Sequence, residues 1–380
     1  MPDLLSAPKQ AVDQRLASTG QSDDVSLLVG GKLYGGWKEI RMTRSIRCLS
    51  GGFELSVSDK WGELKDAWQI VPGNECEVRV GKETLITGYV DRVSPSFSAE
   101  GRSISIAGRD KTADLVDSSA VHTPGGWQNI SLSRLAAILA KPFGVSVTVD
   151  PLAASRANHL SAHPVRITNG ESAFELLEKE ARTAGVLLMT DGKGGILITM
   201  ASSERAKTAL VQGSNILEAS ADYDFKDRFS TYLVKSQLTT LTEGDTSVPE
   251  PSAKGSATDP EIKRYRPLLV IAETLATDAL CRARAQWEAK SRVGKSVKIQ
   301  ASVATWRQID GSLWKLNTVV SFESAWLGMK SDFLISGITF TKGSGGTIAH
   351  LTLEPRDAYS PDPTLRRDQL RDLVIQESRR

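Results

Sequence analysis

The sequence has few cysteines and no long hydrophobic run. Its 380 residues include three cysteines, Cys48, Cys76 and Cys281, an odd number at wide spacings that gives neither a disulfide framework nor a paired thiolate metal site. We therefore expect three buried, reduced thiols. No stretch approaches the roughly 18 apolar residues of a membrane-spanning helix, and the N-terminus lacks a basic region followed by an apolar run. The sequence predicts a protein that is made in the cytoplasm and is not integral to a membrane.

Charge of one sign is not concentrated anywhere in the chain. The 47 Lys and Arg residues are interleaved with 45 Asp and Glu residues, which leaves a net charge of +2. Nucleic-acid-binding domains usually carry a clustered basic face, so sequence-specific DNA or RNA binding is disfavoured. With 40% hydrophobic and 24% charged residues, the composition is that of a globular protein, and its length predicts two to four domains.

Phosphate-binding and metal-binding patterns are also missing. The glycines at residues 30–32 and 192–195 lack the spacing of phosphate-binding loops and predict hairpin turns instead. His159 and His163 have the spacing of a helical metal pair, but they lack the adjacent Glu and stand beside Pro164 in a loop-like region. We predict no metal and no cofactor.

Nucleophile motifs are absent, and carboxylate pairs have simpler explanations. No G-x-S-x-G motif occurs. The pairs Asp114 with Asp117 and Glu171 with Glu175 are candidates for glycoside cleavage only if folding brings them together, and they are better explained as helix-start and solvent-face charges. Most of the eight Trp lie at alternating or amphipathic positions, which favours core packing over sugar stacking. We predict no catalytic residue.

A repeated strand pattern is present. Leu85-Ile-Thr-Gly88 is followed by Arg109-Asp110, and Leu334-Ile-Ser-Gly337 is followed by Arg356-Asp357. Any two antiparallel hairpins share a period of two, so chance similarity is the alternative explanation. We interpret the pattern as one β-domain present twice. Each Arg-Asp pair would then mark the point where the chain leaves its barrel, and we call these two points matched barrel exits. The structural repeat markers are then Gly88, Arg109, Asp110, Gly337, Arg356 and Asp357.

Between the two copies the hydrophobic period changes from two to 3.6, which predicts an α/β domain. The predicted fold class is α+β multidomain, with two similar antiparallel β-barrel domains, an α/β domain and a C-terminal helix. The expected parts are a flexible arm at 1–24, a first β-barrel at 25–118, the α/β domain at 119–205, a discontinuous second β-barrel at 206–240 and 296–358, an inserted loop and long helix at 241–295 that pack with the α/β domain, and a C-terminal helix at 359–380.

Taken together, this order and several motifs resemble the baseplate hub proteins of contractile-tailed phages. The motifs are residues 85–91 with 108–117, Asp222-Tyr-Asp-Phe225 and Arg284-Ala-Gln-Trp-Glu288, and none of them is catalytic. The family includes the Mu-like tail protein P, the hub of T-even phages and the N-terminal part of VgrG spike proteins. The likeness covers nearly the whole chain, from about Val25 to Tyr359.

The resemblance implies a structural protein of the virion tail baseplate and no enzyme. Three subunits with two equivalent barrels each would form a pseudo-six-fold ring between the six-fold tail tube and the trimeric central spike. The implied partners are two further copies of the chain, the tube, spike and baseplate wedge proteins, and the tape-measure protein. The alternatives are a tail-associated peptidoglycan hydrolase and a carbohydrate- or nucleic-acid-binding β-barrel. The sequence does not identify the interface residues.

Overall fold

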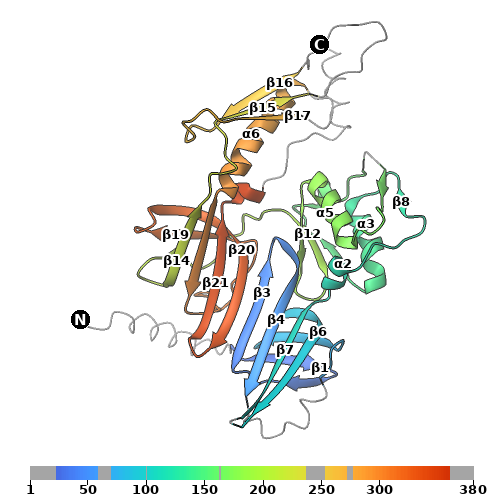
Figure 1. Cartoon of the computed structure of the whole chain (residues 1–380), viewed down its shortest axis with the longest axis vertical. Coiled ribbons are helices and arrows are strands. Elements are labelled where there is room, and N and C mark those ends of the chain that lie inside the picture. The colour runs from blue at the N-terminus through green and yellow to red at the C-terminus, as the bar shows by residue number, and fades with distance from the viewer. Residues whose placement is uncertain are drawn as a thin grey trace. The chain divides into compact units, whose positions relative to one another are not determined.

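The computed structural model describes residues 23–58, 70–99, 101–161, 164–236, 253–271 and 277–359. The predicted C-terminal helix and nearly all of the predicted N-terminal arm lie outside these residues. The chain forms two compact units (Figure 1). Of the described residues, those within 23–161, 165–221 and 299–353 belong to unit 1, and those within 222–298 and 354–359, with Pro164, belong to unit 2. No helix among the described residues is long and apolar enough to cross a membrane.

The first β-copy comprises residues 25–110 and is all antiparallel. Its strands are β1 (Val25–Val29), β2 (Lys32–Tyr34), β3 (Glu39–Ser45), β4 (Cys48–Ser58), β5 (Glu75–Val80), β6 (Glu83–Ser98) and β7 (Gly101–Asp110). They lie in the order β3-β4-β7-β6-β5-β1-β2. Burial alternates as the sequence predicted, for example at Val25, Leu27 and Val29. The predicted turn between β1 and β2 is confirmed, since Gly30 and Gly31 both have positive φ.

The second β-copy comprises residues 210–221 and 299–353 and repeats this topology. Its strands are β13 (Leu210–Val211), β14 (Ile216–Tyr223), β18 (Val297–Val303), β19 (Val319–Ser324), β20 (Met329–Gly343) and β21 (Gly346–Glu354). The neighbour order β14-β18-β21-β20-β19-β13 matches β3-β4-β7-β6-β5-β1, and the strands also follow one another along the chain in the same sequence. One difference is that β13 pairs in parallel with β19, whereas β1 pairs in antiparallel with β5.

The two copies form one open sheet of 13 strands, because β20 of the second copy pairs with β3 of the first. The prediction of two closed barrels is therefore not met in hydrogen bonding among the described strands. The sequence could not reveal this joint, because it pairs residues almost 300 positions apart.

The α/β part lies between the copies in the chain. Its elements are α2 (Ala113–Asp117), β8 (Gly126–Trp127), α3 (Leu132–Ala140), the 3-10 turn η2 (Lys141–Phe143), β9 (Val147–Val149), α4 (Ala154–Ala157), β10 (Val165–Arg166), α5 (Ala173–Ala184), β11 (Leu187–Thr190) and β12 (Ile196–Thr199). Ser131 caps α3, and a capping box of Ser172 and Glu175 starts α5. Gly185 ends α5 in the left-handed conformation.

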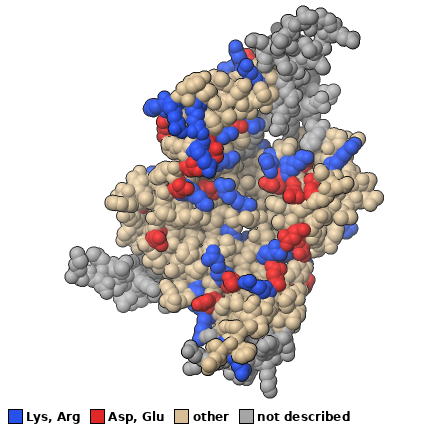
Figure 2. Space-filling view, viewed as in Figure 1, with Lys and Arg blue, Asp and Glu red and all other residues tan. Residues whose placement is uncertain are grey.

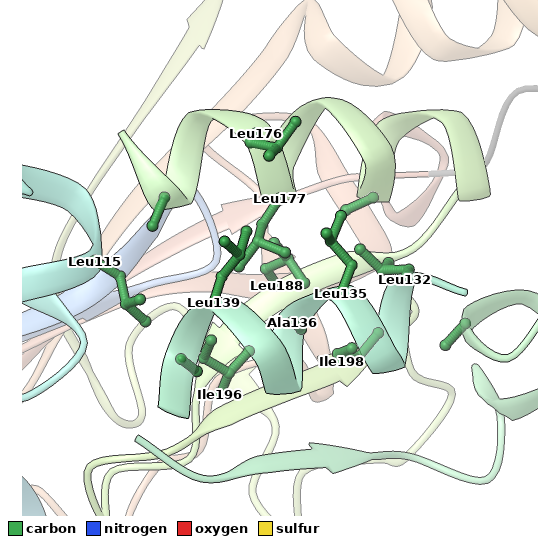
Figure 3. Close-up of a cluster of buried hydrophobic side chains, with 14 of the residues drawn as sticks. Leu115, Leu132, Leu135, Ala136, Leu139, Leu176, Leu177, Leu188, Ile196 and Ile198 are labelled. Atoms are coloured by element: carbon green, nitrogen blue, oxygen red, sulfur yellow. The ribbon is translucent and has the colours of Figure 1, made fainter. Parts of the chain in front are cut away.

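The core of the α/β part lies between its two main helices and its small sheet. Leu135 of α3 packs with Leu177 of α5 and Ile196 of β12 (Figure 3). Leu115 of α2 belongs to the same cluster. The short helix α2, which was assigned to the first β-barrel at 25–118, therefore packs on the core of the α/β part through Leu115.

Unit 2 differs from its prediction. It contains a three-stranded sheet in the order β16-β15-β17, the helix α6 (Asp278–Lys295) and the 3-10 turn η3 (Arg356–Tyr359). The strands are β15 (Thr231–Lys235), β16 (Lys254–Thr258) and β17 (Pro267–Ile271). Residues 231–235 were assigned to the second β-barrel, and residues 254–258 and 267–271 to the inserted loop and long helix, yet all three segments are strands of this sheet.

The buried face of α6 packs on the sheet of unit 2. Cys281, Ala285 and Ala289 of α6 pack against Tyr232 and Val234 of β15. Gly255 of β16 allows this close packing, since a Cβ atom there would lie 2.1 Å from the backbone nitrogen of Arg282. The helix and the sheet thus form one small α/β layer pair within unit 2.

The prediction of three buried thiols is wrong for one of them. Cys48, at the start of β4, is exposed, whereas Cys76 and Cys281 are buried. Burial raises the pKa of the Cys76 thiol to about 12. All three cysteines are free, as predicted.

Candidate assembly interface

The chemical candidates of the sequence have structural roles. Glu175 accepts the backbone N–H of Ser172 in the capping box, and Asp117 is paired with Arg109. His163 lies outside the described residues, and His159 precedes a short bridge in a turn. Among the described residues, no group of three or more His, Cys, Asp or Glu side chains could hold a metal ion. The features that remain for function are the joints within the chain and the free strand edges.

The joint between the two β-copies is a regular antiparallel ladder. It runs from Gly337 opposite Ser45 to Lys342 opposite Ile40. The hydroxyls of Thr43 and Thr339 are 3.2 Å apart across it. Met42 and Phe340, which face each other in this register, are both buried. The joint therefore has the ladder bonds and apolar packing of a continuous sheet interior.

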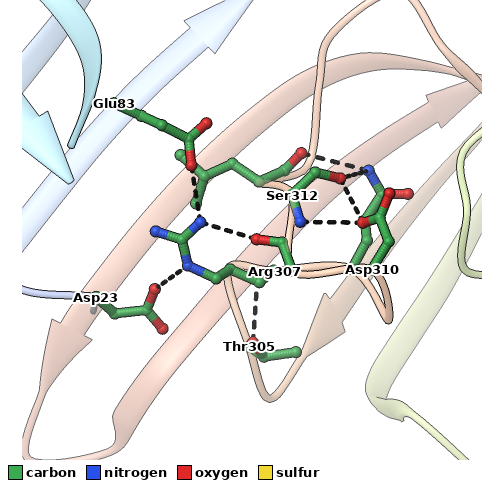
Figure 4. A network of polar contacts seen from close by, with 9 residues as sticks. Asp23, Glu83, Thr305, Arg307, Asp310 and Ser312 are labelled. Atoms are coloured by element: carbon green, nitrogen blue, oxygen red, sulfur yellow. Dashed lines mark hydrogen bonds and ion pairs between the residues drawn. The ribbon is translucent and has the colours of Figure 1, made fainter. Parts of the chain in front are cut away.

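A buried arginine connects the same two copies at a second point. Arg307 follows β18, and its guanidinium donates to Asp23 at 2.7 Å and to Glu83, the first residue of β6, at 2.8 Å (Figure 4). It also donates to the carbonyl oxygen of Gly311 at 2.9 Å, which fixes the loop that carries it. The Arg307 side chain is 2% exposed. A planar guanidinium with several fixed acceptors holds the two copies in one orientation.

The α/β part is attached to the first β-copy through Asp110. This carboxylate accepts the hydroxyl of Thr190 at 2.7 Å and the backbone N–H and hydroxyl of Thr112 at 3.0 and 2.9 Å. Burial raises the pKa of Asp110, while these hydrogen bonds act in the opposite direction. Arg44 of β3 donates to the carbonyl oxygen of Thr190 at 3.0 Å and completes the attachment.

Arg109 lies next to this attachment on the exposed side of β7. It donates to Asp117 at 2.8 Å and to Asp91 at 2.7 Å, and these hydrogen bonds raise its pKa. Its side chain is 44% exposed, so each pair contributes little stability, about 0–1 kcal/mol. The exposed Arg109 therefore adds little to this attachment, which depends on the buried Asp110.

The six repeat markers do not occupy equivalent positions. Gly88 pairs with Cys76 of β5, whereas Gly337 lies beyond the last pair of β19 and faces Ser45 of β3. Asp110 is a buried strand residue, whereas Arg356 and Asp357 are exposed in η3 of unit 2. The predicted matched barrel exits are therefore wrong, although the duplicated topology is present.

Val90 of β6 and Ile335 of β20 occupy equivalent positions in the two β-copies. The backbone N–H of Val90 donates to the carbonyl oxygen of Asn74, and the carbonyl oxygen of Val90 accepts the N–H of Gly73. In the second copy, the N–H of Ile335 donates to the carbonyl oxygen of Thr318, and the carbonyl oxygen of Ile335 accepts the N–H of Asn317. Gly73 and Asn317 both have positive φ, at 90° and 59°. Different side chains therefore build one turn, which is why the sequence pattern did not reveal it.

A surface ion pair in the second β-copy gives a pH-dependent test of the structure. Arg205 and Ser321 donate to Asp332 at 2.6–2.8 Å, and they lower the pKa of its carboxyl to about 2. A lowered carboxyl pKa stabilises the fold at pH values above the unfolded pKa of about 3.9, and this contribution is lost as the pH falls through about 2.

We expect Asp332 to titrate near pH 2 by NMR and the Arg205→Gln variant to raise that midpoint. An Arg79→Gln control should leave it unchanged, and equal shifts in both variants would contradict this assignment.

The charge distribution on the surface agrees with the sequence. Figure 2 shows Lys and Arg mixed with Asp and Glu over the visible face. Surface charges of the described residues also form ion pairs, including Arg92 with Glu54 and Lys330 with Glu323. This face of the molecule does not form a basic stripe that could follow a nucleic-acid backbone.

Comparison with known proteins identifies the family. Residues 24–110 match the family model of the Mu phage baseplate assembly protein GpP-like N-terminal domain, residues 112–200 match the second domain of baseplate hub protein gp44-like, and residues 277–362 match the fourth domain of GpP. The baseplate hub protein gp44 of Escherichia phage Mu is 34% identical over 344 residues, which are 89% of each chain. The chain belongs to the Mu baseplate hub family.

Solved structures support the family fold. The 43 kDa tail protein of prophage MuSo2 from Shewanella oneidensis is 35% identical with a TM-score of 0.76, over 89% of this chain and 99% of that one. A tail protein from Neisseria meningitidis MC58, 21% identical, has the same fold with a TM-score of 0.73 over 90% and 98% of the two chains. A type VI secretion component of Escherichia coli, 10% identical over 90% and 80%, shares the fold with a TM-score of 0.54.

The resemblance found in the sequence is thus confirmed. The chain is a baseplate hub protein of a Mu-like phage tail, and its place is the virion tail. The motif residues 85–91 and 108–117, on which part of the resemblance rested, lie in β6, in β7 and at the start of the α/β part.

Proposed function

We propose that this hub protein acts as a homotrimer whose two β-copies per chain form a pseudo-six-fold ring between the tail tube and the central spike. The observation that carries the proposal is the duplicated strand order joined by β20 and β3 into one sheet. Three chains with two β-copies of the same strand order each present six similar units, while the assembly keeps the three-fold symmetry of a trimeric spike.

The joints within the chain suit a ring that must keep its shape. The β20–β3 ladder and the Arg307 contacts fix the angle between the two copies, which is the angle that sets the curvature of a ring. Obligate interfaces of this kind typically bury about 2,000 Å² or more. The expected partners are two further copies, the tube, spike and wedge proteins, and the tape-measure protein.

We further propose that the protein is not an enzyme. The relatives that it matches are described as baseplate and tail proteins. The carboxylate pairs considered from the sequence are used in a helix cap and an ion pair. A peptidoglycan hydrolase and a carbohydrate- or nucleic-acid-binding barrel remain alternatives without a supporting observation.

The mass of the full chain in solution tests the proposal. At micromolar concentration we expect light scattering to give three times the chain mass and electron micrographs to show rings with a central opening. A strictly monomeric species without rings would contradict the proposal. Zymography on peptidoglycan and a filter assay with oligonucleotides, both expected to be negative, separate the alternatives.

A further inference from the structure

The three-stranded sheet of unit 2 has one face that packs on α6 and one face that does not. Tyr232 and Val234 of β15 point toward α6, which lies along one side of the sheet (Figure 1). Side chains alternate along a strand, so residues 231, 233 and 235 point to the opposite side. The register places residues 254, 256 and 258 of β16 and residues 267, 269 and 271 of β17 on that side as well. We call these residues the outer face.

The centre of the outer face is apolar and exposed. Leu233 of β15 lies opposite Leu269 of β17 in the parallel register, and these residues are 38% and 53% exposed. Ile271, two residues further along β17, is also 53% exposed. None of the three belongs to the core between the sheet and α6. Adjacent apolar side chains that remain in water typically mark a surface that another molecule covers.

One end of the outer face carries two lysines side by side. Lys235 of β15 lies directly opposite Lys254 of β16 in the antiparallel register. Neither side chain forms an ion pair with a described residue, and the outer face itself contains no Asp or Glu. Like charges in directly opposed positions destabilise a sheet. A carboxylate supplied by another molecule would remove this repulsion.

The connection from β16 to β17 adds cations beyond the other end. Residues 263–266 read Lys-Arg-Tyr-Arg and directly precede β17, and the tyrosine is 92% exposed. The buried Arg228 donates to Asp259 before this segment at 2.8 Å, and the hydroxyl of Ser230 accepts the N–H of Arg266 at 2.9 Å. These contacts fix both ends of the connection. An exposed aromatic residue among cations on a fixed turn is a suitable anchor for a negatively charged partner.

We infer that the outer face of unit 2 binds an acidic surface of another tail protein, with apolar side chains at the centre of that surface and carboxylates toward both ends. The exposed leucines lose contact with water only against an apolar partner, and the cations at the two ends favour opposite charge. A nucleic acid presents phosphates but no aliphatic surface. The chain is a baseplate hub protein, so its neighbours in the virion are proteins.

The inference goes beyond the proposed ring and does not depend on it. The ring is built from the two β-copies of unit 1, whereas the outer face belongs to unit 2. The mass measurement that tests the trimer therefore does not decide whether the outer face binds a partner, and the two proposals can fail separately.

Photo-cross-linking of the full chain in assembled tails tests the inference. The photoreactive residue p-benzoylphenylalanine replaces Leu269 on the outer face in one variant and the exposed Lys290 of α6 in the other. We expect position 269 to become joined to a segment of a different tail protein that is rich in Asp and Glu, as identified by mass spectrometry. The yield at position 290 should be roughly tenfold lower. Equal yields, no product, or a product with this chain alone or with a segment without acidic residues would overturn the inference.

Charge reversal provides a second readout. Lys254→Glu places opposite charges across the strands at Lys235, so the thermal midpoint of the free chain should not fall. The yield of assembled tails should nevertheless fall roughly tenfold, because the new carboxylate repels an acidic partner. The control Lys290→Glu should leave the midpoint and the yield unchanged. A fall of midpoint and yield together would indicate a role in folding only, and an unchanged yield in Lys254→Glu would also contradict the inference.

Two further probes separate an acidic protein from other anionic partners. Phosphatidylglycerol vesicles and a short DNA duplex are each mixed with the full chain and with Lys254→Glu at physiological salt. We expect the substitution to change binding to neither probe, because the outer face is specific for a protein. Binding to vesicles or DNA that the substitution abolishes would assign the outer face to a lipid surface or a nucleic acid and would overturn the inference.

Discussion

Replacing Gly88 with Ala is expected to destabilise unit 1 by about 3 kcal/mol, a large effect for one methyl group. A Cβ atom on Gly88 would lie 1.9 Å from the carbonyl oxygen of Arg109 and 2.8 Å from the backbone carbonyl carbon of Asp110. Both atoms belong to the backbone of β7, so no side-chain rotation can relieve the overlap. The two strands must separate locally, and with them the ladder that leads to the buried Asp110.

The matched control is Gly337→Ala. There the nearest atom to a new Cβ is the hydroxyl oxygen of Thr352 at 3.1 Å, which belongs to a side chain that can adjust. We expect a loss below about 1 kcal/mol. Denaturant midpoints measured at equal protein concentration compare the two variants. Equal shifts of the two denaturant midpoints would contradict this prediction, because they would mean that the two glycines are packed in the same way.

Replacing Arg228 with Met is expected to cost unit 2 about 3–5 kcal/mol. Arg228 and Asp259 are each 2% exposed and form two hydrogen bonds of 2.8 and 2.9 Å. The guanidinium also lies 4.2 Å from the ring centroid of Phe225. Removal of the cation leaves the Asp259 carboxylate buried without its partner, which costs more than the pair itself contributes.

Two controls identify the cause. The double variant Arg228→Met with Asp259→Leu should recover most of the lost stability, because it also removes the buried carboxylate that has no partner. Lys226→Met breaks an exposed pair with Asp224 and should leave the stability of unit 2 nearly unchanged. Thermal unfolding followed by circular dichroism provides the comparison. A double variant no more stable than Arg228→Met alone would show that packing of the arginine stem, and not charge, dominates.

The sequence predicted the strands of both β-copies and the helices of the α/β part because each depends on local periodicity. These local signals span only a few residues, as in the alternation of Val25, Leu27 and Val29 and in the helix cap at Ser131. The strands of unit 2 were missed for the same reason. Lys254-Gly-Ser-Ala-Thr258 has the composition of a loop, and the apolar run at 268–271 continues into a helical pattern, so only pairing with β15 makes both segments strands.

The ends of the sheet could not be predicted from the sequence, because a strand edge is a property of the assembled sheet. Residues 92–97 and 216–221 look like ordinary strands until the strand order shows that each segment lies at an edge among the described strands. The motif that first suggested duplication illustrates the opposite case. Gly88 and Gly337 are preceded by similar residues in the sequence but pair with different strands, β5 and β3. The correct conclusion that a β-domain is repeated therefore came from residues that are not equivalent in the structure.

The β20–β3 joint also constrains how the chain can fold as it is synthesised. Thr43 and Thr339, which meet across this joint, are separated by 296 positions in the chain. When the first copy leaves the ribosome, its β3 edge lacks its β20 partner until residues 337–342 have been translated. An unpaired edge is a template for aggregation during this time, and a contact of such high sequence separation forms slowly. The protein therefore depends on late C-terminal residues to finish a domain that began near its N-terminus, and a truncated chain would expose β3 permanently.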